Sequence, residues 1–310
     1  MKKFLTKLAV GLAALSLVNV DAEACTIMLV TKGAAADGNV FISHCDDGFG
    51  NDPNTVFVPA KNHKKGSLRP VYSSAATTKA IGNIPEVEHT YAYIDADYPA
   101  VNEHGLMLAE CTDLCAWLPE IPYKEGGGIF YSSELGRVAM ERCKTAREAI
   151  KLMGKLVDEY GIYGKSKSMF VADKDEGWIF EMQPTPDGKG GLWIAEKIPD
   201  GHFSIAANQL RIHAVREGDP NQIFNPRLPQ MLEELGWAAY DAQGNLDWVK
   251  SLRAVEIDHP YYSMRRVWRG LSTVAPSLNL SPTVAGYDSD YYPLSVNPDK
   301  KLAITDIMSL

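Results

Sequence analysis

The chain has 310 residues, of which 45% are hydrophobic and 23% charged, and its formal net charge is −8. This composition is typical of a globular protein and excludes a disordered chain, a collagen-like rod and a multi-span membrane protein. The acidic balance, without a basic cluster, argues against nucleic acid as the main partner. Five cysteines are too few for a disulfide-built miniprotein, and their odd number leaves at least one thiol unpaired within the chain.

Residues 1–24 have the features of a secretory signal peptide. A short basic start precedes Leu8–Val18, an apolar run that carries no charge and is too short to span a membrane. The Ala-Glu-Ala sequence of Ala22–Ala24 is a small-residue cleavage pattern. Its central glutamate disfavours a lipoprotein signal. We therefore expect removal of this segment, a secreted or periplasmic protein, and a single mature domain over residues 25–310.

Cleavage at this point would make Cys25 the new N-terminal residue. A free α-amino group has a pKa of about 7.7–8.0 and is partly neutral near pH 7, so it can take a proton from the thiol of its own residue. Cysteine is strongly nucleophilic as the thiolate. After acyl transfer, the protonated amine can donate its proton to the leaving nitrogen. The alternative is that Cys25 lies near the cleavage point by chance and packs as an ordinary cysteine.

The elements after Cys25 begin with a predicted hairpin. Thr26–Thr31 and Val40–His44 are rich in β-branched and apolar residues, and an Asp-Gly turn separates them. Antiparallel pairing of these strands would return the segment His44–Asp47 to the neighbourhood of Cys25. The sequence therefore predicts a cluster of polar and nucleophilic side chains at one end of a hairpin.

The rest of the chain predicts further strands and a smaller number of helices. Strands are expected at Tyr91–Ile94, Gly105–Glu110, Ser168–Ala172, Trp178–Met182, Leu192–Glu196 and His202–Ala207. Helices are expected over 133–142, behind the capping box Thr145–Glu148, and at Pro229–Leu235, Trp248–Val255 and Trp268–Leu271. Strands and helices do not alternate regularly, which favours layered antiparallel sheets covered by helices, in one compact domain.

Several strings together resemble one family of enzymes. They are Cys25-Thr26, Asp37-Gly38, Asn102-Glu-His-Gly-Leu-Met107, Ala207-Asn-Gln-Leu-Arg211 and Tyr261-Tyr-Ser-Met-Arg-Arg-Val-Trp-Arg269. In these the mature chain resembles the dipeptidase A-type cysteine peptidases, relatives of the secernins, and more distantly penicillin V acylase and bile salt hydrolase. All are N-terminal-nucleophile hydrolases. The resemblance implies an α+β, four-layer αββα fold with two stacked antiparallel sheets.

The resemblance also implies roles for individual residues. Cys25 matches the nucleophile and N-terminal base, and Asp47 matches the acid that contacts its amino group. Asn102 matches the asparagine of the oxyanion hole, Asn208 a second asparagine of the site, and Arg266 an arginine near the nucleophile. Each has an ordinary alternative, since asparagine and aspartate are common turn and cap residues.

Two details remain open around these assignments. Arg265 and Arg269 compete with Arg266 for the role of the arginine. Relatives often have Arg-Asn where this chain has His44 and Cys45, so His44 is a candidate for substrate contact in place of the arginine.

No cofactor is expected. Cys111 and Cys115 have a spacing that permits a local disulfide, which only geometry can decide. Zinc is disfavoured because no second pair of ligands lies at a suitable spacing. The expected partner is a short peptide substrate, without a membrane span, and assembly into a homo-oligomer is left open.

The leading hypothesis is a secreted cysteine dipeptidase that acts through Cys25. An amidase or acyltransferase on acyl amides would use the same chemistry, and a non-catalytic secreted binding protein is the alternative from another class. Relatives of this type usually continue further, so either the chain is a truncated member of the family, or its C-terminal part is missing or on another polypeptide. A helix is predicted to begin near the end, after a capping Thr305.

Overall fold

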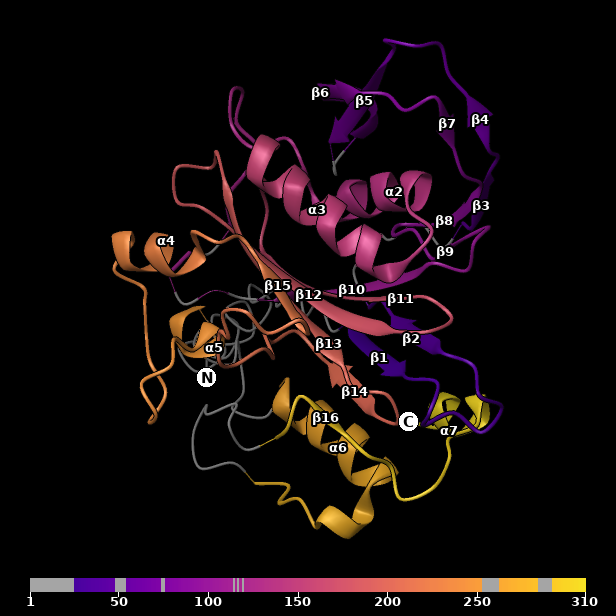
Figure 1. Cartoon of the computed structure of the whole chain (residues 1–310), viewed down its shortest axis with the longest axis vertical. Coiled ribbons are helices and arrows are strands. Elements are labelled where there is room, and N and C mark those ends of the chain that lie inside the picture. Colours follow the sequence, from indigo (N-terminus) through magenta and orange to yellow (C-terminus); the bar gives the residue numbers. More distant parts are fainter. Residues whose placement is uncertain are drawn as a thin grey trace, which may run out of the picture.

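Two antiparallel sheets lie face to face in the computed structural model of this chain, with helices on their outer faces (Figure 1). The structure describes residues 25–47, 54–73, 76–113, 115, 117–118, 120–252, 262–283 and 292–310. The predicted signal segment 1–24 lies outside the described residues.

The smaller sheet begins next to Cys25. It has the strand order β16-β14-β1-β2, formed by β1 (Thr26–Val30), β2 (Phe41–Cys45), β14 (Phe203–Ala206) and β16 (Ser295–Val296). The apolar sequence of β1 suits a position between two neighbouring strands. β1 and β2 form the predicted hairpin, with Thr26 opposite Cys45, and Gly38 supplies a φ of +74° in the turn.

The larger sheet has eight strands in the order β15-β13-β12-β11-β10-β9-β8-β3. They are β3 (Val56–Val58), β8 (Tyr93–Asp95), β9 (Val101–Asn102), β10 (Met107–Asp113), β11 (Ser166–Ala172), β12 (Gly177–Pro184), β13 (Gly191–Ile198) and β15 (Gln222–Phe224). The pairing of β11 with β12 confirms the hairpin predicted there. Both strands are buried along their whole length, because the sheet is covered on both faces.

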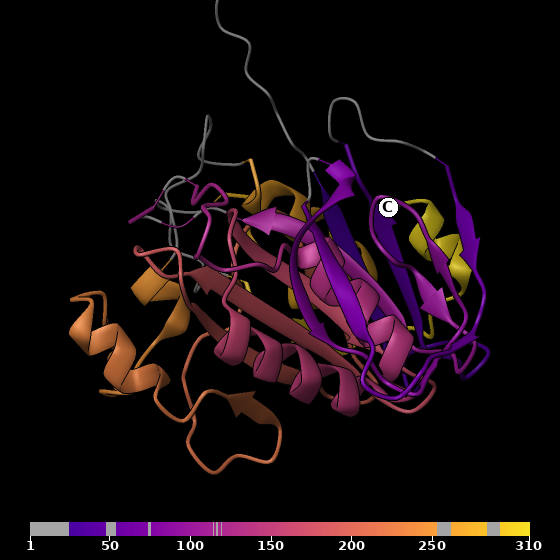
Figure 2. The same cartoon turned by 90° about the horizontal axis from the view of Figure 1, so that it is seen from above.

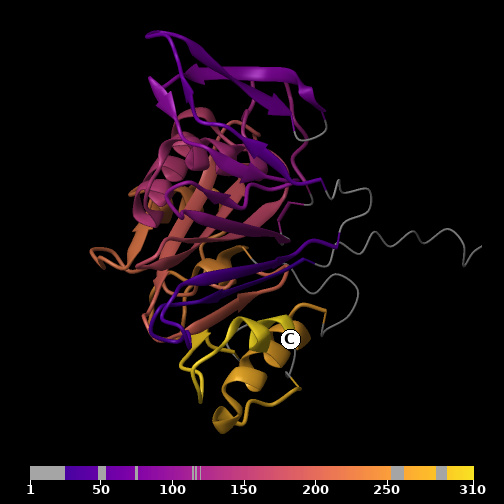
Figure 3. The same ribbon diagram turned by 90° about the vertical axis from the view of Figure 1, so that its right-hand side faces the viewer.

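Helices complete the layers. The outer face of the large sheet is covered by α2 (Ser132–Arg142) and α3 (Ala146–Tyr160), and the outer face of the small sheet by α6 (Met264–Val274), as Figures 2 and 3 show. Apart from the apolar layers under the helices, an apolar cluster fills the space between the two sheets and includes Cys25, Ile27 and Phe170. This mixed α/β architecture with stacked antiparallel sheets agrees with the expected class.

The remaining elements lie at the periphery. Two short two-stranded sheets pair β4 (Lys61–Asn62) with β7 (His89–Thr90) and β5 (Leu68–Ser73) with β6 (Ala76–Pro85). The short helices are α4 (Leu228–Glu234), α5 (Trp248–Leu252), η1 (Pro276–Leu278) and α7 (Ile304–Met308). The cap predicted at Thr305 is wrong, because the N-cap of α7 is Ala303, two residues earlier, and the Asp306 carboxylate accepts the N–H of Ala303.

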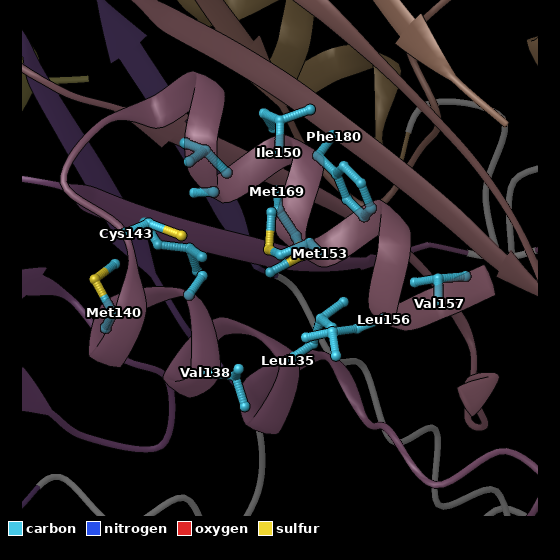
Figure 4. Close-up of a cluster of buried hydrophobic side chains, with 14 of the residues drawn as sticks. Leu135, Val138, Met140, Cys143, Ile150, Met153, Leu156, Val157, Met169 and Phe180 are labelled. Atoms are coloured by element: carbon cyan, nitrogen blue, oxygen red, sulfur yellow. The ribbon is translucent and has the colours of Figure 1, made fainter. Parts of the chain in front are cut away.

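The core between the helices and the large sheet is tightly packed (Figure 4). The predicted capping box of α3 is confirmed, since Thr145 and Glu148 bond each other's backbone N–H groups. Gly154 of α3 lies against the indole of Trp193, where an added Cβ would be 2.3 Å from Cζ2. The glycine therefore permits a close approach of helix to sheet.

Gly154→Ala is expected to lower the free energy of unfolding by about 1–3 kcal/mol, because the overpacking outweighs the higher helix propensity of alanine. Urea unfolding measures the change. Lys151→Ala, at an exposed position of the same helix, is the control and should stay within about 0.5 kcal/mol of wild type. Equal stability of wild type and Gly154→Ala would contradict the close contact with Trp193.

Candidate active site

Cys25 lies immediately before β1 and is only 4% exposed. Its thiol donates a hydrogen bond to Oδ1 of Asp46, with a sulfur–oxygen distance of 3.3 Å. The register explains this partner: Thr26 lies opposite Cys45, so the residue before Thr26 lies opposite the residue after Cys45. The carboxylate nearest to the sulfur is therefore Asp46, which the sequence analysis did not single out.

The carboxylate of Asp47, the acid predicted to contact the amino group of Cys25, is not the partner of the Cys25 thiol. It accepts a hydrogen bond from the thiol of Cys45 at 2.9 Å. Side chains alternate along an extended chain, so Asp47 follows Cys45 to the face opposite to that of Asp46. Asp47 contacts Cys25 through its backbone, in a hydrogen bond that favours the thiolate. Contact with a free amino group of Cys25 stays a prediction.

Burial keeps the thiol of Cys25 protonated in this chain. Desolvation raises its pKa to about 12, and the hydrogen bond and negative charge of Asp46 act in the same direction. The positive charge of Lys167 acts in the opposite direction. Since the nitrogen of Cys25 is a peptide nitrogen in the full chain, no amine is present there to take the proton.

Arg266 of α6 connects four groups around Cys25. Its Nη1 donates to the carbonyl oxygen of Cys25 at 2.6 Å and to Oγ1 of Thr26 at 3.0 Å. Its Nη2 donates to the carbonyl of Ala207 at 3.2 Å and to Oδ1 of Asn208 at 2.8 Å. Of the three arginines weighed from the sequence, Arg266 is therefore the one beside the nucleophile candidate, and Arg265 and Arg269 are exposed.

Asn208 is held by the same network. Its backbone has a φ of +60°, and its amide Nδ2 donates to the carbonyl of Thr112 at 2.5 Å. The side chain is 4% exposed. Asparagine tolerates the left-handed conformation better than most residues, which fits its place directly after the strand β14. The structure thus brings Asn208, Arg266 and Cys25 together, as expected.

Asn102 forms its hydrogen bonds outside the network around Cys25, and its predicted role in an oxyanion hole stays a prediction. Its two amide hydrogens are donated to the carbonyls of Met140 and Cys143, at 2.9 and 2.8 Å. Its oxygen accepts the backbone N–H groups of His104 and Leu106. With every amide atom engaged, Asn102 ties the β9–β10 turn to the end of α2 and has no hydrogen left for a substrate oxygen.

His44 lies at the end of β2 and is exposed. Its ring centroid is 5.5 Å from that of Tyr98, in a tilted arrangement. Its contact with substrate stays a prediction.

A buried ion pair near Cys25 was missed from the sequence. Glu110 of β10 and Lys167 of β11 are each 1% exposed, and Oε1 of Glu110 lies 2.9 Å from Nζ of Lys167. The ammonium also donates to Oγ1 of Thr112 and lies 4.7 Å from the ring centroid of Tyr131. The sequence feature that could have indicated the pair is the charged Glu110 at the end of the apolar strand predicted over Gly105–Glu110. The pair places a positive charge close enough to favour the Cys25 thiolate.

Two further buried carboxyl groups lie between the sheets. The hydroxyl oxygen of Ser168 is 2.5 Å from Oδ2 of Asp113 and 3.2 Å from Oε1 of Glu181. A hydroxyl has one hydrogen to donate, so bridging both groups requires a proton on one of the carboxyls. Desolvation is the main reason that the pKa of Asp113 rises to about 7 and that of Glu181 to about 8.

These raised pKa values predict a loss of stability on the alkaline side. The folded chain binds more protons than the unfolded chain between about pH 4 and pH 8, so the free energy of unfolding falls as pH rises through 7 and 8. We expect a decrease of about 2–4 kcal/mol between pH 5 and pH 9 in urea unfolding. Asp113→Asn should flatten this dependence, whereas Asp37→Asn, in the exposed turn after β1, should preserve it. An unchanged slope in Asp113→Asn would contradict the assignment.

The other cysteines form no disulfide. Cys25, Cys45, Cys111, Cys115 and Cys143 are all free thiols, so the local bridge considered between Cys111 and Cys115 is absent. No group of three potential metal ligands occurs among the residues that the structure describes. In the same part of the chain, no helix has the length and apolarity that crossing a membrane would require.

Comparison with known proteins places the chain in one family. The sequence profile of peptidase family C69 matches residues 24–310. A probable dipeptidase of Latilactobacillus sakei is 24% identical over 93% of this chain and 60% of its own length. Another of Salmonella dublin is 26% identical over 92% of this chain and 65% of its own, and a probable dipeptidase B of Lactococcus lactis is 25% identical over 79% and 52%. The chain thus spans less than two thirds of the length of these relatives. It belongs to peptidase family C69.

Proposed function

We propose that the chain is a secreted cysteine dipeptidase of the N-terminal-nucleophile type, with Cys25 as its nucleophile. The observation that carries the proposal is the hydrogen bonding of Arg266 to both Cys25 and Asn208 at the start of β1. The match to family C69 begins at residue 24, directly before Cys25. The names of the relatives, probable dipeptidases, support the substrate class.

Removal of residues 1–24 would supply the missing base. The freed amine of Cys25 takes the proton of the thiol, and the thiolate attacks the carbonyl carbon of the peptide bond. The carbon–nitrogen bond breaks, the protonated amine gives its proton to the leaving nitrogen, and a thioester remains on Cys25. Water then cleaves the thioester, which releases the carboxylic acid and restores the thiol.

The oxyanion of the attack needs donors other than Asn102, whose hydrogens are used. Asn208 is the better candidate, because only one hydrogen of its amide has a partner in the described part of the chain. A neutral amide donor stabilises developing negative charge without competing for the proton of the thiol. Arg266 holds the oxygen of Asn208 and the carbonyl of Cys25, so it fixes donor and nucleophile relative to each other.

The test begins with N-terminal sequencing of the purified mature protein, which should begin at Cys25. This form should hydrolyse unmodified dipeptides, whereas a form that retains residues 1–24 through substitutions at Ala22 and Ala24 should not. Hydrolysis of acylated amines alone would replace the dipeptidase proposal by the amidase alternative. Absence of turnover on both substrate classes, with Cys25 free at the N-terminus, would favour the binding-protein alternative.

A further inference from the structure

A cavity of about 550 Å³ lies away from Cys25, between α2, the edge strand β3, the neighbouring strand β8, and β5. These elements surround α2 in Figure 1. None of Cys25, Asp46, Asn208 and Arg266 lines the cavity. Its volume is within the range of small-molecule sites, about 300–1,000 Å³. We refer to it as the Tyr93 cavity, after the residue of β8 in its wall.

The two arginines in the wall are saturated by protein acceptors. Arg69 forms a bidentate pair with Glu141, at 2.6 and 2.9 Å, and also donates to Glu134 at 2.6 Å. Arg137 donates from Nε to both carboxylate oxygens of Asp95, at 3.1 and 2.8 Å, and from Nη2 to two backbone carbonyls. Guanidinium groups held in this way fix the wall and offer few donors to an anionic ligand.

Negative charge predominates in the cavity. Four carboxylates line it, from Asp95, Asp97, Glu134 and Glu141, against the two guanidinium groups. The formal surplus of two negative charges in a partly enclosed space attracts cations and repels anions. The charge of the wall therefore selects a cationic ligand.

Tyr93 provides a second and independent indication of a ligand. Its side chain is 5% exposed and lines the cavity. No hydrogen bond joins its hydroxyl to another residue in the described part of the chain. The hydroxyl oxygen is not among the fully buried polar atoms, so it faces the cavity, where a ligand that donates a hydrogen bond can reach it. Burial and the charges of Glu141 and Asp95 raise the pKa of Tyr93, which keeps the hydroxyl neutral.

We propose that the Tyr93 cavity is a binding site for a small organic cation with a primary ammonium group, separate from the site at Cys25. The ammonium has three hydrogens, which suits it to the hydroxyl of Tyr93 together with carboxylate oxygens of the wall. A neutral polar molecule of the same size lacks the charge that the wall favours, and a carboxylate would meet like charge.

Isothermal titration with 1,4-diaminobutane tests the proposal, with 1,4-butanediol as the uncharged probe of the same length. The full chain is expected to bind the diamine and not the diol, with an affinity that decreases as salt is raised. Tyr93→Phe removes only the hydroxyl and should weaken binding about 3–10-fold. Tyr240→Phe, an exposed tyrosine outside the cavity, is the matched control and should bind as wild type does.

Asp95→Asn gives a second variant, which removes one negative charge of the wall and should weaken binding about tenfold or more. Circular dichroism checks that each variant is folded. No heat of binding with millimolar diamine, equal binding of the diol, or full affinity in Tyr93→Phe would each overturn the proposal. None of these measurements uses hydrolysis, so the result is independent of the function proposed for Cys25.

Discussion

Cys25→Ala is expected to abolish the proposed peptide hydrolysis by the form that begins at residue 25, a loss of at least about 10⁴-fold in kcat, because alanine cannot form the thioester. Cys25→Ser should lose nearly as much, since a hydroxyl has far less of its anion near neutral pH than a thiol. The measurement is initial-rate hydrolysis of a dipeptide over a range of concentrations.

Cys45→Ser is the matched control for the nucleophile. Cys45 is a second free thiol two residues from Asp47, it is exposed, and it lies on the face of the hairpin opposite to that of the Cys25 side chain. It should keep wild-type activity. Full activity in Cys25→Ala, or loss of activity only in Cys45→Ser, would contradict the assignment of the nucleophile.

Arg266→Met is expected to lower kcat/KM about 10²–10³-fold and to reduce the free energy of unfolding by about 2–4 kcal/mol. Methionine fills much of the same space but donates nothing to the carbonyl of Cys25, Oγ1 of Thr26 or Oδ1 of Asn208. The nucleophile and the proposed oxyanion donor would then lose their common anchor. Steady-state kinetics and urea unfolding measure the two effects.

Arg269→Met changes an exposed arginine on the same helix and is the control for Arg266→Met. It should alter neither kcat/KM nor stability beyond about 0.5 kcal/mol. Arg266→Lys separates charge from geometry, because a lysine keeps the positive charge but cannot reach four acceptors from one planar group. Activity close to wild type in Arg266→Lys would indicate that charge alone is required.

The local sequence pattern was sufficient to predict much of the fold. The hairpin β1–β2, the hairpin β11–β12 and the capping box of α3 each depend on residues close in the sequence, and all three were predicted. The two small sheets within residues 61–90 were not predicted. β4 and β7 have two residues each, too few for alternation to be recognised, and the pairing of β5 with β6 contains register shifts that interrupt a regular pattern.

The site was predicted less completely than the fold, for physical reasons. Asn102 matched a family position, yet its amide is used by carbonyls of α2, a contact between distant segments that the sequence does not reveal. Asp46 and Asp47 are adjacent, and only the register of the hairpin decides which side chain faces Cys25. The pairing of Glu110 with Lys167 likewise depends on the alignment of β10 with β11.

The hydrogen bond from Arg266 to Cys25 joins residues that are 241 positions apart. Contacts of such high sequence separation close large loops, and the entropy of loop closure opposes their formation. During synthesis, most of the chain must therefore emerge before the anchor of the nucleophile exists. A growing chain that has not yet reached α6 holds Cys25 without this anchor, so the hydrogen bonds that fix the proposed nucleophile can form only after residue 266 has been made.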